Sequence, residues 1–312
     1  MRVVFFGTPR FAVPSLQALI DAGFDVPLVV TQPDRPVGRS SRPRPSAVGE
    51  LARDRGIEVE KPERLRGNTN FLERLAAVRP DAIAVVAYGK LLPDEVLDLP
   101  PLGCVNVHAS LLPRHRGASP IPAAILAGDR ETGVVTMRIV PALDAGPLYL
   151  ERRALVGARE TAASLSERLA REGAELLVET LRGLERGSLV PRPQVGEPTL
   201  SRPIRREDAR VDWNESATVI DRRLRAFTPW PGLHATLGGE RVKLLELEPA
   251  GRIISARQPG LIWEELGEPL VAAGRGTAIL LKTVQRAGRR PVSGSEFLRG
   301  IPFRPARFEP AS

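Results

Sequence analysis

Short, almost wholly apolar runs alternate with segments of helical period along the first 189 residues. The apolar runs predict strands at 2–7, 26–31, 57–60, 81–87, 105–108 and 134–140. The segments of helical period predict helices at 12–22, 47–55, 69–78 and 161–184. A strand that is apolar on both faces is typical of a parallel sheet covered by helices on both sides. The sequence therefore predicts a doubly wound α/β domain with a mostly parallel sheet, whose ligands bind at the carboxyl ends of the strands.

A proline-rich stretch separates this domain from a second one. Residues 190–203 contain four prolines, which fit neither a helix nor a central strand and indicate a linker. After a helix at 217–226, alternating segments with glycine-bearing turns predict strands at 234–237, 242–247, 260–264, 270–273 and 278–284. Such a pattern is typical of a small antiparallel barrel. We expect a Rossmann-like domain at 1–189, a linker at 190–206 and an OB-like β-barrel domain at 207–312.

The cysteine content and the length of the apolar runs indicate the cellular compartment, and the spacing of cysteine and histidine bears on metal binding. Cys104 is the only cysteine, so we expect no intrachain disulfide and a reducing compartment. Cys104 itself stands in an apolar run and is expected to be a small buried hydrophobic residue. The first apolar run is too short for a signal peptide and no run has the length of a membrane span, so we expect a cytoplasmic protein. No cysteine or histidine cluster has the spacing of metal ligands, and we expect no metal.

The charge bears on the partner. The chain carries a net charge of +8 at pH 7, with a pI of about 10.5, which favours a polyanionic partner such as nucleic acid. The first turn, at 7–9, lacks the Gly-x-Gly-x-x-Gly pattern, and the sequence has no P-loop. It therefore carries neither the dinucleotide fingerprint nor the common nucleotide-phosphate loop.

One strand ends with an amide and an imidazole on the same face. Side chains of a strand alternate between its two faces, so Asn106 and His108, two residues apart, emerge together. An amide can hold an oxygen while an imidazole moves a proton, which is the minimum equipment for acyl or formyl transfer. A lone Asn-x-His pair is also compatible with a histidine that is merely hydrogen-bonded at a strand end.

Several motifs together identify a resemblance. The chain resembles the methionyl-tRNA formyltransferase family, enzymes that use 10-formyltetrahydrofolate, over nearly its whole length. The matching stretches are 6–9, 31–39, 85–89, 106–117, 143–146, 225–232 and 285–290. Asn-x-His-x-Ser-Leu-Leu-Pro with a downstream Asp-x-Gly is specific for 10-formyltetrahydrofolate-dependent formyltransferases as a group. It does not distinguish among their acceptors.

The resemblance implies a catalytic set of Asn106, His108 and Asp144, with no metal and no covalent nucleophile. Asn106 is expected to hold the oxyanion of the tetrahedral intermediate. His108 is expected either to act as a base or to donate to the oxyanion, and the sequence leaves both roles open. A carboxylate at Asp144 would orient the imidazole, although Leu-Asp-Ala-Gly is equally good turn chemistry.

The resemblance also implies a folate site for the formyl donor, 10-formyltetrahydrofolate. The residues expected to contact it are Ser110, Leu111, Leu112, Pro113, Val86, Tyr88 and Gly89. The strand end at 86–89 and the loop at 139–144 would flank the pterin ring, which backbone groups could read. Leu111 and Leu112 are also compatible with plain core packing.

The expected acceptor is initiator methionyl-tRNA, and arginines are its expected contacts. The arginines in question are Arg35, Arg39, Arg42 and Arg44 in the loop 32–46, and Arg286, Arg289 and Arg290 in the second domain. Arginine on a loop suits phosphates and base edges, although a solvated arginine-rich surface would look the same. Ser40-Ser41-Arg42 departs from the family's common Gly-Lys-Lys, which puts the contacts of this loop in question.

Two alternatives remain from the sequence. One is another formyltransferase or a hydrolase that uses 10-formyltetrahydrofolate, although such an enzyme would have no reason to carry the arginine loop. The other is a catalytically inactive RNA-binding relative, which need not keep Asn106, His108 and Asp144 together. We expect a monomer, because a tRNA would have to lie across both domains.

Overall fold

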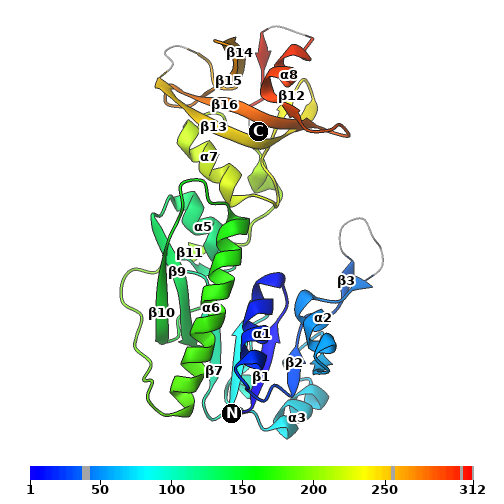
Figure 1. The fold of residues 1–312 in the computed structure, drawn as a ribbon, viewed down its shortest axis with the longest axis vertical. Coiled ribbons are helices and arrows are strands. Elements are labelled where there is room, and N and C mark those ends of the chain that lie inside the picture. Colours follow the sequence, from blue (N-terminus) through cyan, green and yellow to red (C-terminus); the bar gives the residue numbers. More distant parts are fainter. Residues whose placement is uncertain (37–42, 254–256, 303–304, 311–312) are drawn as a thin grey trace. The chain divides into compact units, whose positions relative to one another are not determined.

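The computed structural model describes residues 1–36, 43–253, 257–302 and 305–310 and divides into two compact units (Figure 1). The first unit consists of Met1–Pro120, Arg130–Leu155 and Ser166–Ser201. The second unit consists of Ile121–Asp129, Val156–Leu165 and Arg202–Ser312. Among the described residues, no helix combines the length and the apolar character needed to cross a membrane.

The first unit is built on a seven-stranded sheet in the order β10-β9-β7-β6-β1-β2-β5. Its strands are β1 (Val3–Gly7), β2 (Leu28–Val30), β5 (Glu58–Glu60), β6 (Ala82–Val86), β7 (Cys104–His108), β9 (Glu131–Arg138) and β10 (Leu148–Leu155). The pairs from β7 to β5 are parallel, whereas β9 and β10 are antiparallel to their neighbours. The prediction of a mostly parallel α/β sheet is therefore confirmed.

Helices cover both faces of this sheet. The helices of this unit are α1 (Val13–Asp21), α2 (Ala47–Asp54), α3 (Thr69–Val78), α4 (Asp94–Leu97) and α6 (Ala162–Glu185), with a short 3₁₀ turn η1 (Arg10–Ala12) before α1. Apart from Pro120, helix α5 (Pro120–Ala127) belongs to the second unit. Val3 and Phe5 of β1 pack in one apolar cluster with residues of α1, α2 and α6. Val4 and Phe6 pack in a second cluster with residues of α3 on the opposite face. This alternation explains why β1 is apolar at every position.

Strand β10 was not predicted from the sequence, because its middle is charged. Arg152 and Arg153 lie on this edge strand, where their guanidinium groups bind Glu175 and Glu131 at 2.5 and 2.8 Å. Charged side chains on an edge strand are a common protection against pairing with other chains. The apolar pattern that marks a central strand is therefore missing from β10.

Two short ladders lie outside the large sheet. Strands β3 (Arg35–Pro36) and β4 (Pro43–Arg44) form an antiparallel pair at the base of the arginine loop. Strands β8 (Arg116–Gly117) and β11 (Leu200–Ser201) form a parallel pair. The second ladder joins the loop after β7 to a segment some eighty residues later in the chain.

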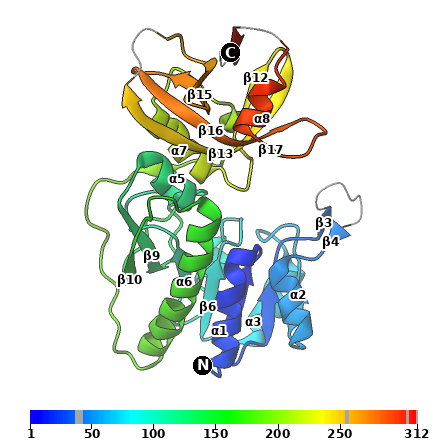
Figure 2. The ribbon, with the colours of Figure 1, turned by 45° about the horizontal axis from the view of Figure 1, so that its top comes forward.

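The second unit contains a nearly closed antiparallel β-barrel (Figure 2), as predicted. Its strands are β12 (His234–Leu237), β13 (Glu240–Ile253), β14 (Leu261–Glu265), β15 (Glu268–Ala273), β16 (Thr277–Arg286), β17 (Val292–Ser293) and β18 (Ala306–Arg307). They follow the order β12-β13-β16-β15-β14-β18, with β17 on β16. The amide of Glu309 donates to the carbonyl of Thr236 at 2.9 Å, which brings the chain after β18 back to β12.

The barrel is accompanied by the 3₁₀ turn η2 (Glu207–Ala209) and by the helices α7 (Ala217–Ala226) and α8 (Gly294–Arg299). Helix α7 has the predicted bounds, whereas α8 was not predicted. The hydroxyl of Ser293 accepts a hydrogen bond from the amide of Glu296 at 3.1 Å and caps α8. Ser-x-x-Glu is the signature of a helix start, so the sequence did contain a signal for α8.

Three stacked aromatic rings form part of the core of the second unit. The ring centroids of Trp213 and Phe308 lie 5.1 Å apart, and those of Phe297 and Phe308 lie 6.3 Å apart. Trp213, Phe297 and Phe308 are all buried. Because Phe308 follows β18 directly, the stack also holds the closing segment of the barrel.

We predict that Phe308→Ala destabilises the second unit by about 3–5 kcal/mol, because it removes the middle ring of the stack and leaves a cavity. Urea unfolding followed by tryptophan fluorescence measures the change. Leu266→Ala is the control, because Leu266 is 92% exposed and its truncation should change the free energy of unfolding by no more than about 0.5 kcal/mol. A loss of stability at Phe308 as small as that at Leu266 would contradict the role of the stack.

Candidate active site

Asn106 and His108 lie at the carboxyl end of β7, between β6 and β9. Asn106 is opposite Val85 on β6, and His108 is opposite Val135 on β9. His108 is buried and Asn106 is partly buried. Among the described residues, none makes a hydrogen bond with the side-chain amide of Asn106. This amide is therefore available to a ligand beside a histidine that is closed off from solvent.

The two ring nitrogens of His108 face different groups. Nε2 lies 3.1 Å from the carbonyl oxygen of His115, and Nδ1 lies 3.7 Å from Oδ2 of Asp144. A carbonyl oxygen only accepts hydrogen bonds, so in the neutral ring the proton is on Nε2. The basic nitrogen is then Nδ1, on the side of the Asp144 carboxylate.

Burial holds His108 in its neutral form. Burial of the ring lowers the pKa of His108 below its ordinary value of 6.5, and the charge of His115 acts in the same direction. The Asp144 carboxylate and the hydrogen bond to the His115 carbonyl raise this pKa, but they offset the effect of burial only in part. At neutral pH the side chain is therefore a base beside a carboxylate.

Asp144 lies in the loop between β9 and β10, in an unusual backbone conformation. Its φ angle is +45°, a region that residues with side chains seldom adopt. Its Oδ2 accepts a hydrogen bond from the amide of Gly117 at 2.8 Å. Gly146 lets the loop approach β9, because a Cβ at this position would lie 1.7 Å from the carbonyl oxygen of Arg138. In the Asp-x-Gly pattern, the aspartate therefore supplies the carboxylate beside His108, and the glycine permits the close approach of the loop to β9.

The predicted folate residues after β7 line an apolar wall. Leu112 is buried in a cluster with Val135, Met137 and Leu148, and Leu111 packs on this cluster while partly exposed. The hydroxyl of Ser110 is buried and donates to the carbonyl of Arg114 at 2.5 Å, and Pro113 is buried as well. Leu111 is the member of this group that presents apolar surface to solvent.

The predicted residues after β6 contribute mainly backbone. Val86 and Tyr88 are buried, and the Tyr88 ring packs edge-on against Phe6 with centroids 5.1 Å apart. Burial raises the pKa of Tyr88 to about 12, and its hydroxyl has no partner among the described residues. Ala87, with φ of +47°, and Gly89, with φ of +88°, are exposed. Their backbone, and not the Tyr88 ring, faces outward.

Two residues that sequence reasoning did not assign to the site fix this turn. The carbonyl oxygen of Tyr88 accepts hydrogen bonds from Oγ1 of Thr8 and from Nε2 of Gln32, each at 3.1 Å. The amide of Gln32 in turn donates to Oγ1 of Thr8 at 3.3 Å. The carboxyl ends of β1, β2 and β6 are therefore tied together. Thr8 directly follows β1 and Gln32 is the second residue after β2, so polar residues just beyond two apolar strands were the available signal.

The arginine loop is described only in part. Arg39 and Arg42 lie outside the described residues, while Arg35 and Arg44 are exposed and stand opposite each other across β3 and β4. Asp34 binds the ammonium of Lys61 at 2.6 Å. Because like charges that face each other across a ladder repel, Arg35 and Arg44 form a surface that an anion would stabilise.

The predicted arginines of the second unit differ in their surroundings. The Arg286 guanidinium lies 5.3 Å from the ring centroid of Phe297 and donates to the carbonyl of Gly300 at 3.2 Å. Arg289 and Arg290 are exposed. Arg290 has an 85% exposed side chain and lies 3.8 Å from Glu296. Arg286 therefore has a packing role, whereas the other two extend into solvent.

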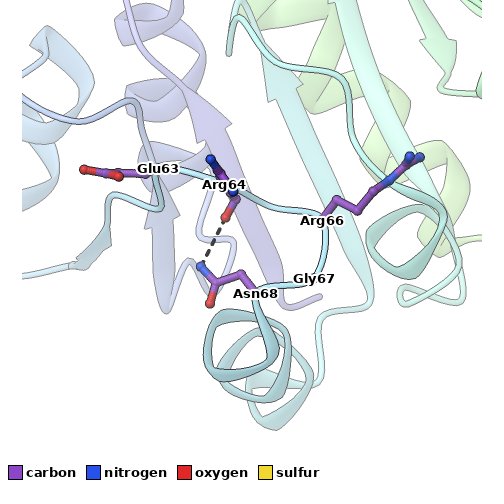
Figure 3. A pocket seen from close by; sticks show the side chains of 5 residues that line it. All are labelled: Glu63, Arg64, Arg66, Gly67 and Asn68. Atoms are coloured by element: carbon purple, nitrogen blue, oxygen red, sulfur yellow. Dashed lines mark hydrogen bonds between the residues drawn. The ribbon is translucent and has the colours of Figure 1, made fainter.

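A separate open pocket of about 500 Å³ lies in the loop before α3 (Figure 3). It is lined by Glu63, Arg64, Arg66, Gly67 and Asn68, none of them a predicted site residue. The side chain of Asn68 is occupied, since it caps α3 at the amide of Phe71 and donates to the carbonyl of Arg64. The lining offers no apolar wall for a flat ring system.

The remaining candidates for reactive chemistry are the thiol of Cys104 and any cluster of metal-binding side chains. Cys104 is buried, its thiol donates to the carbonyl of Val96 at 3.6 Å, and burial raises its pKa to about 12. It is therefore a buried structural residue and a poor nucleophile. The part of the chain that the structure describes holds no group of three or more histidine, cysteine or acidic side chains arranged for a metal ion.

Comparisons with known proteins agree on one family. The formyl transferase family matches residues 1–181, and the formyl transferase C-terminal domain matches residues 203–302. The methionyl-tRNA formyltransferase of Methylococcus capsulatus is 48% identical over 302 residues, covering 96% of each chain. That of Thermus thermophilus is 45% identical over 305 residues and covers 98% of each chain.

Solved structures share the fold at lower identity. WlaRD, a sugar 3N-formyl transferase crystallised in the presence of dTDP and 5-N-formyl-THF, has a TM-score of 0.67 at 16% identity. The similarity covers 93% of this chain and 99% of that one. HypX from Aquifex aeolicus in complex with tetrahydrofolic acid has a TM-score of 0.61 at 19% identity, over 99% of this chain and 50% of that chain.

We predict that His108 titrates below pH 6.5 and that Asp144→Asn lowers its pKa further, because the variant removes the charge that favours the imidazolium. Asparagine tolerates the backbone conformation of Asp144, so the change is mainly electrostatic. NMR titration of the ring protons measures both values, with His115→Gln and His234→Gln assigning the other two histidines. An ordinary or raised pKa, or no response to Asp144→Asn, would contradict the geometry described above.

Proposed function

The chain belongs to the formyl transferase family and, within it, to the methionyl-tRNA formyltransferases, and we propose that Asn106, His108 and Asp144 are its catalytic residues. The enzyme transfers the formyl group of 10-formyltetrahydrofolate to the α-amine of methionyl-initiator tRNA. The product is the formylmethionyl-tRNA with which translation begins. The observation that carries the proposed site is the neutral, buried imidazole of His108 beside the Asp144 carboxylate.

His108 acts as the base in this proposal. The α-amine must lose a proton to attack the formyl carbon, and the folate nitrogen must gain one to leave. Nδ1 of His108 is unprotonated when Nε2 donates to the His115 carbonyl, so Nδ1 accepts the proton and later returns it. The Asp144 carboxylate, 3.7 Å away, stabilises the imidazolium that forms between these two steps.

Asn106 stabilises the tetrahedral intermediate. Attack of the amine converts the formyl oxygen to an oxyanion, and collapse of that intermediate breaks the bond to the folate nitrogen. The side-chain amide of Asn106 donates to the oxyanion, an interaction typically worth about 3 kcal/mol for one well-placed donor. Because Asn106 and His108 share one face of β7, both act on the same carbon.

The folate lies against the loop ends around this set. Leu111 supplies exposed apolar surface on the buried Leu112 cluster, and Ser110 and Pro113 hold the turn behind it. The outward backbone at the end of β6, from Val86 through Tyr88 to Gly89, is suited to the donor and acceptor edge of a pterin ring. Tyr88 takes part through its backbone, since its ring packs in the core.

Arginines contact the tRNA in this proposal. Arg35 and Arg44 lie at the base of the loop that contains Arg39 and Arg42, and Arg289 and Arg290 are the exposed arginines of the β16–β17 turn. Arg286 supports that turn through its contacts with Phe297 and Gly300. We infer a cytoplasmic monomer, because translation initiates in the cytoplasm and a tRNA can span both units of one chain.

We predict that Asn106→Ala lowers kcat by about 10²–10³-fold because an oxyanion donor is removed. We expect His108→Ala to lower kcat by about 10²–10⁴-fold because the base is removed.

The assay is formyl transfer from 10-formyltetrahydrofolate to charged initiator tRNA, with charged elongator methionyl-tRNA as control. Unchanged melting temperatures would show that the variants are folded. Near-normal turnover of the His108 variant would disprove the assignment, and transfer to neither tRNA by the unaltered enzyme would overturn the function.

We predict that tRNA binding weakens steeply as salt rises and that Arg35→Gln with Arg44→Gln reduces the salt slope by about one for each phosphate that the loop no longer neutralises. Filter binding or fluorescence titration from about 50 to about 300 mM salt, a range that brackets physiological ionic strength, measures the slope. The matched control is Arg171→Gln with Arg186→Gln, which removes the same charge from exposed positions on and after α6. Equal slopes for the two double variants would show that the loop makes no specific phosphate contact.

A further inference from the structure

The proline-rich stretch 190–201, which we call the strap, is docked on the first unit and belongs to it. The amide of Arg192 donates to the carbonyl of Leu148 at 2.8 Å, and the amide of Leu148 donates back to Arg192 at 2.7 Å. Of residues 192–200, only Gln194 is partly buried, and the others are exposed. Between Arg192 and Leu200, Gln194 is therefore the one polar residue that is partly buried.

Gln194 makes four hydrogen bonds through its side-chain amide. Its Nε2 donates to the carbonyl oxygens of Asp144 and Gly146, each at 2.8 Å. Its Oε1 accepts from Nε and Nη2 of Arg116 at 3.1 and 2.6 Å. Carbonyls only accept and a guanidinium only donates, so the orientation of the amide is unambiguous. Every donor and acceptor site of this side chain is used.

These bonds join the two loops that carry the site. Arg116 lies in the loop after β7, and Asp144 lies in the loop after β9. The amide of Gly117 also donates to Oδ2 of Asp144, so Asp144 is held at its backbone by Gln194 and at its carboxylate by Gly117. A residue in the left-handed region needs such support, because its conformation is unfavourable by itself.

The C-terminal end of the strap contacts the loop whose carbonyl binds Nε2 of His108. Oγ1 of Thr199 accepts from the amide of His115 at 2.8 Å, and the carbonyl of Thr199 accepts from the amide of Arg116 at 2.8 Å. Strand β11 continues this contact along β8, where a Cβ on Gly117 would lie 2.4 Å from the carbonyl oxygen of Ser201. His115 is the residue whose carbonyl accepts from Nε2 of His108.

We propose that the strap is a positioning element of the formyl-transfer site. Gln194 is the positioning residue for Asp144, and Thr199 is the positioning residue for the His115 carbonyl that orients His108. The inference rests on the proposed roles of His108 and Asp144. It adds that their separation is set by a segment outside the sheet, which leads at Arg202 directly into the second unit.

The test is Gln194→Met, which keeps the length of the side chain and removes all four hydrogen bonds. We expect kcat to fall about 10–100-fold, because small displacements of catalytic groups have effects of this size. KM for the tRNA should change little. The acid limb of the kcat profile should move to lower pH, as in Asp144→Asn, because a displaced carboxylate raises the pKa of His108 less. General loss of stability would not shift that limb.

Companion variants separate the contacts. Gln194→Glu keeps an acceptor for Arg116 but presents no hydrogen to the two carbonyls, so its kcat should fall as well. Thr199→Val removes the acceptor for the His115 amide, so its kcat should fall. Thr199→Ser keeps the hydroxyl and should retain activity. Glu197→Gln and Val195→Ala change exposed strap residues and should behave as the unaltered enzyme. Should Gln194→Met fail to fold, the Gln194→Glu and Thr199 variants decide the matter.

Asp144→Asn distinguishes failure of the inference from failure of the proposed site. If Asp144→Asn retains normal turnover, the proposed catalytic set is wrong. If Asp144→Asn loses activity while Gln194→Met and Gln194→Glu keep normal kcat and an unshifted acid limb, the strap has no positioning role. Loss of activity in both, with the shared shift of the acid limb in Gln194→Met, supports the inference.

Discussion

The hydrogen bond between Nε2 of His108 and the carbonyl of His115 determines what the site can do. It fixes which ring nitrogen carries the proton and therefore leaves the basic nitrogen on the side of Asp144. Because the ring is buried, the neutral form is favoured and the imidazole can accept a proton. The neighbouring elements are arranged around this contact: β7 carries the ring, the following loop carries the carbonyl, and the strap holds that loop in place.

Charge is used differently in the two units. In the first, arginines on the edge strand β10 are paired with acids, whereas Arg35 and Arg44 face each other across the ladder of β3 and β4. In the second, Arg286 packs on an aromatic ring while Arg290 extends into solvent. A basic sequence is thus a mixture of structural and exposed arginines. Only the exposed ones are suited to a polyanion, since a guanidinium committed to packing has few donors to spare.

Much of the fold could be predicted from the sequence, because burial imposes a readable pattern. The central strands are apolar on both faces, and α3 and α7 have the expected bounds because their apolar spacing is helical. The strand period also predicted the shared face of Asn106 and His108. Strand β10 lacks the pattern because its charges are satisfied by ion pairs with distant residues. Its place in the sheet depends on tertiary contacts that the local sequence does not reveal.

The sequence indicated which residues form the candidate site, but not the contacts that hold them in place. The resemblance placed Tyr88 among the folate residues, and the structure adds that its ring packs against Phe6 in the core, after a left-handed residue at Ala87. The contact between Asp144 and His108 joins residues from different loops, so the resemblance supplied it and the local pattern did not. The proline content of 190–203 correctly excluded helix and central strand, but it contained no sign that Gln194 would lie between two loops.

The strap also matters to anyone who divides this chain. Four prolines and a run of exposed residues suggest a convenient place to cut, to insert a tag or to exchange one barrel for another. A fragment that ends after α6 keeps all seven strands of the sheet and the three proposed catalytic residues, yet it lacks Gln194 and Thr199. A boundary after Ser201 keeps both. For a chimera or an isolated catalytic fragment, the useful border therefore lies at the end of the strap and not at the end of the last helix.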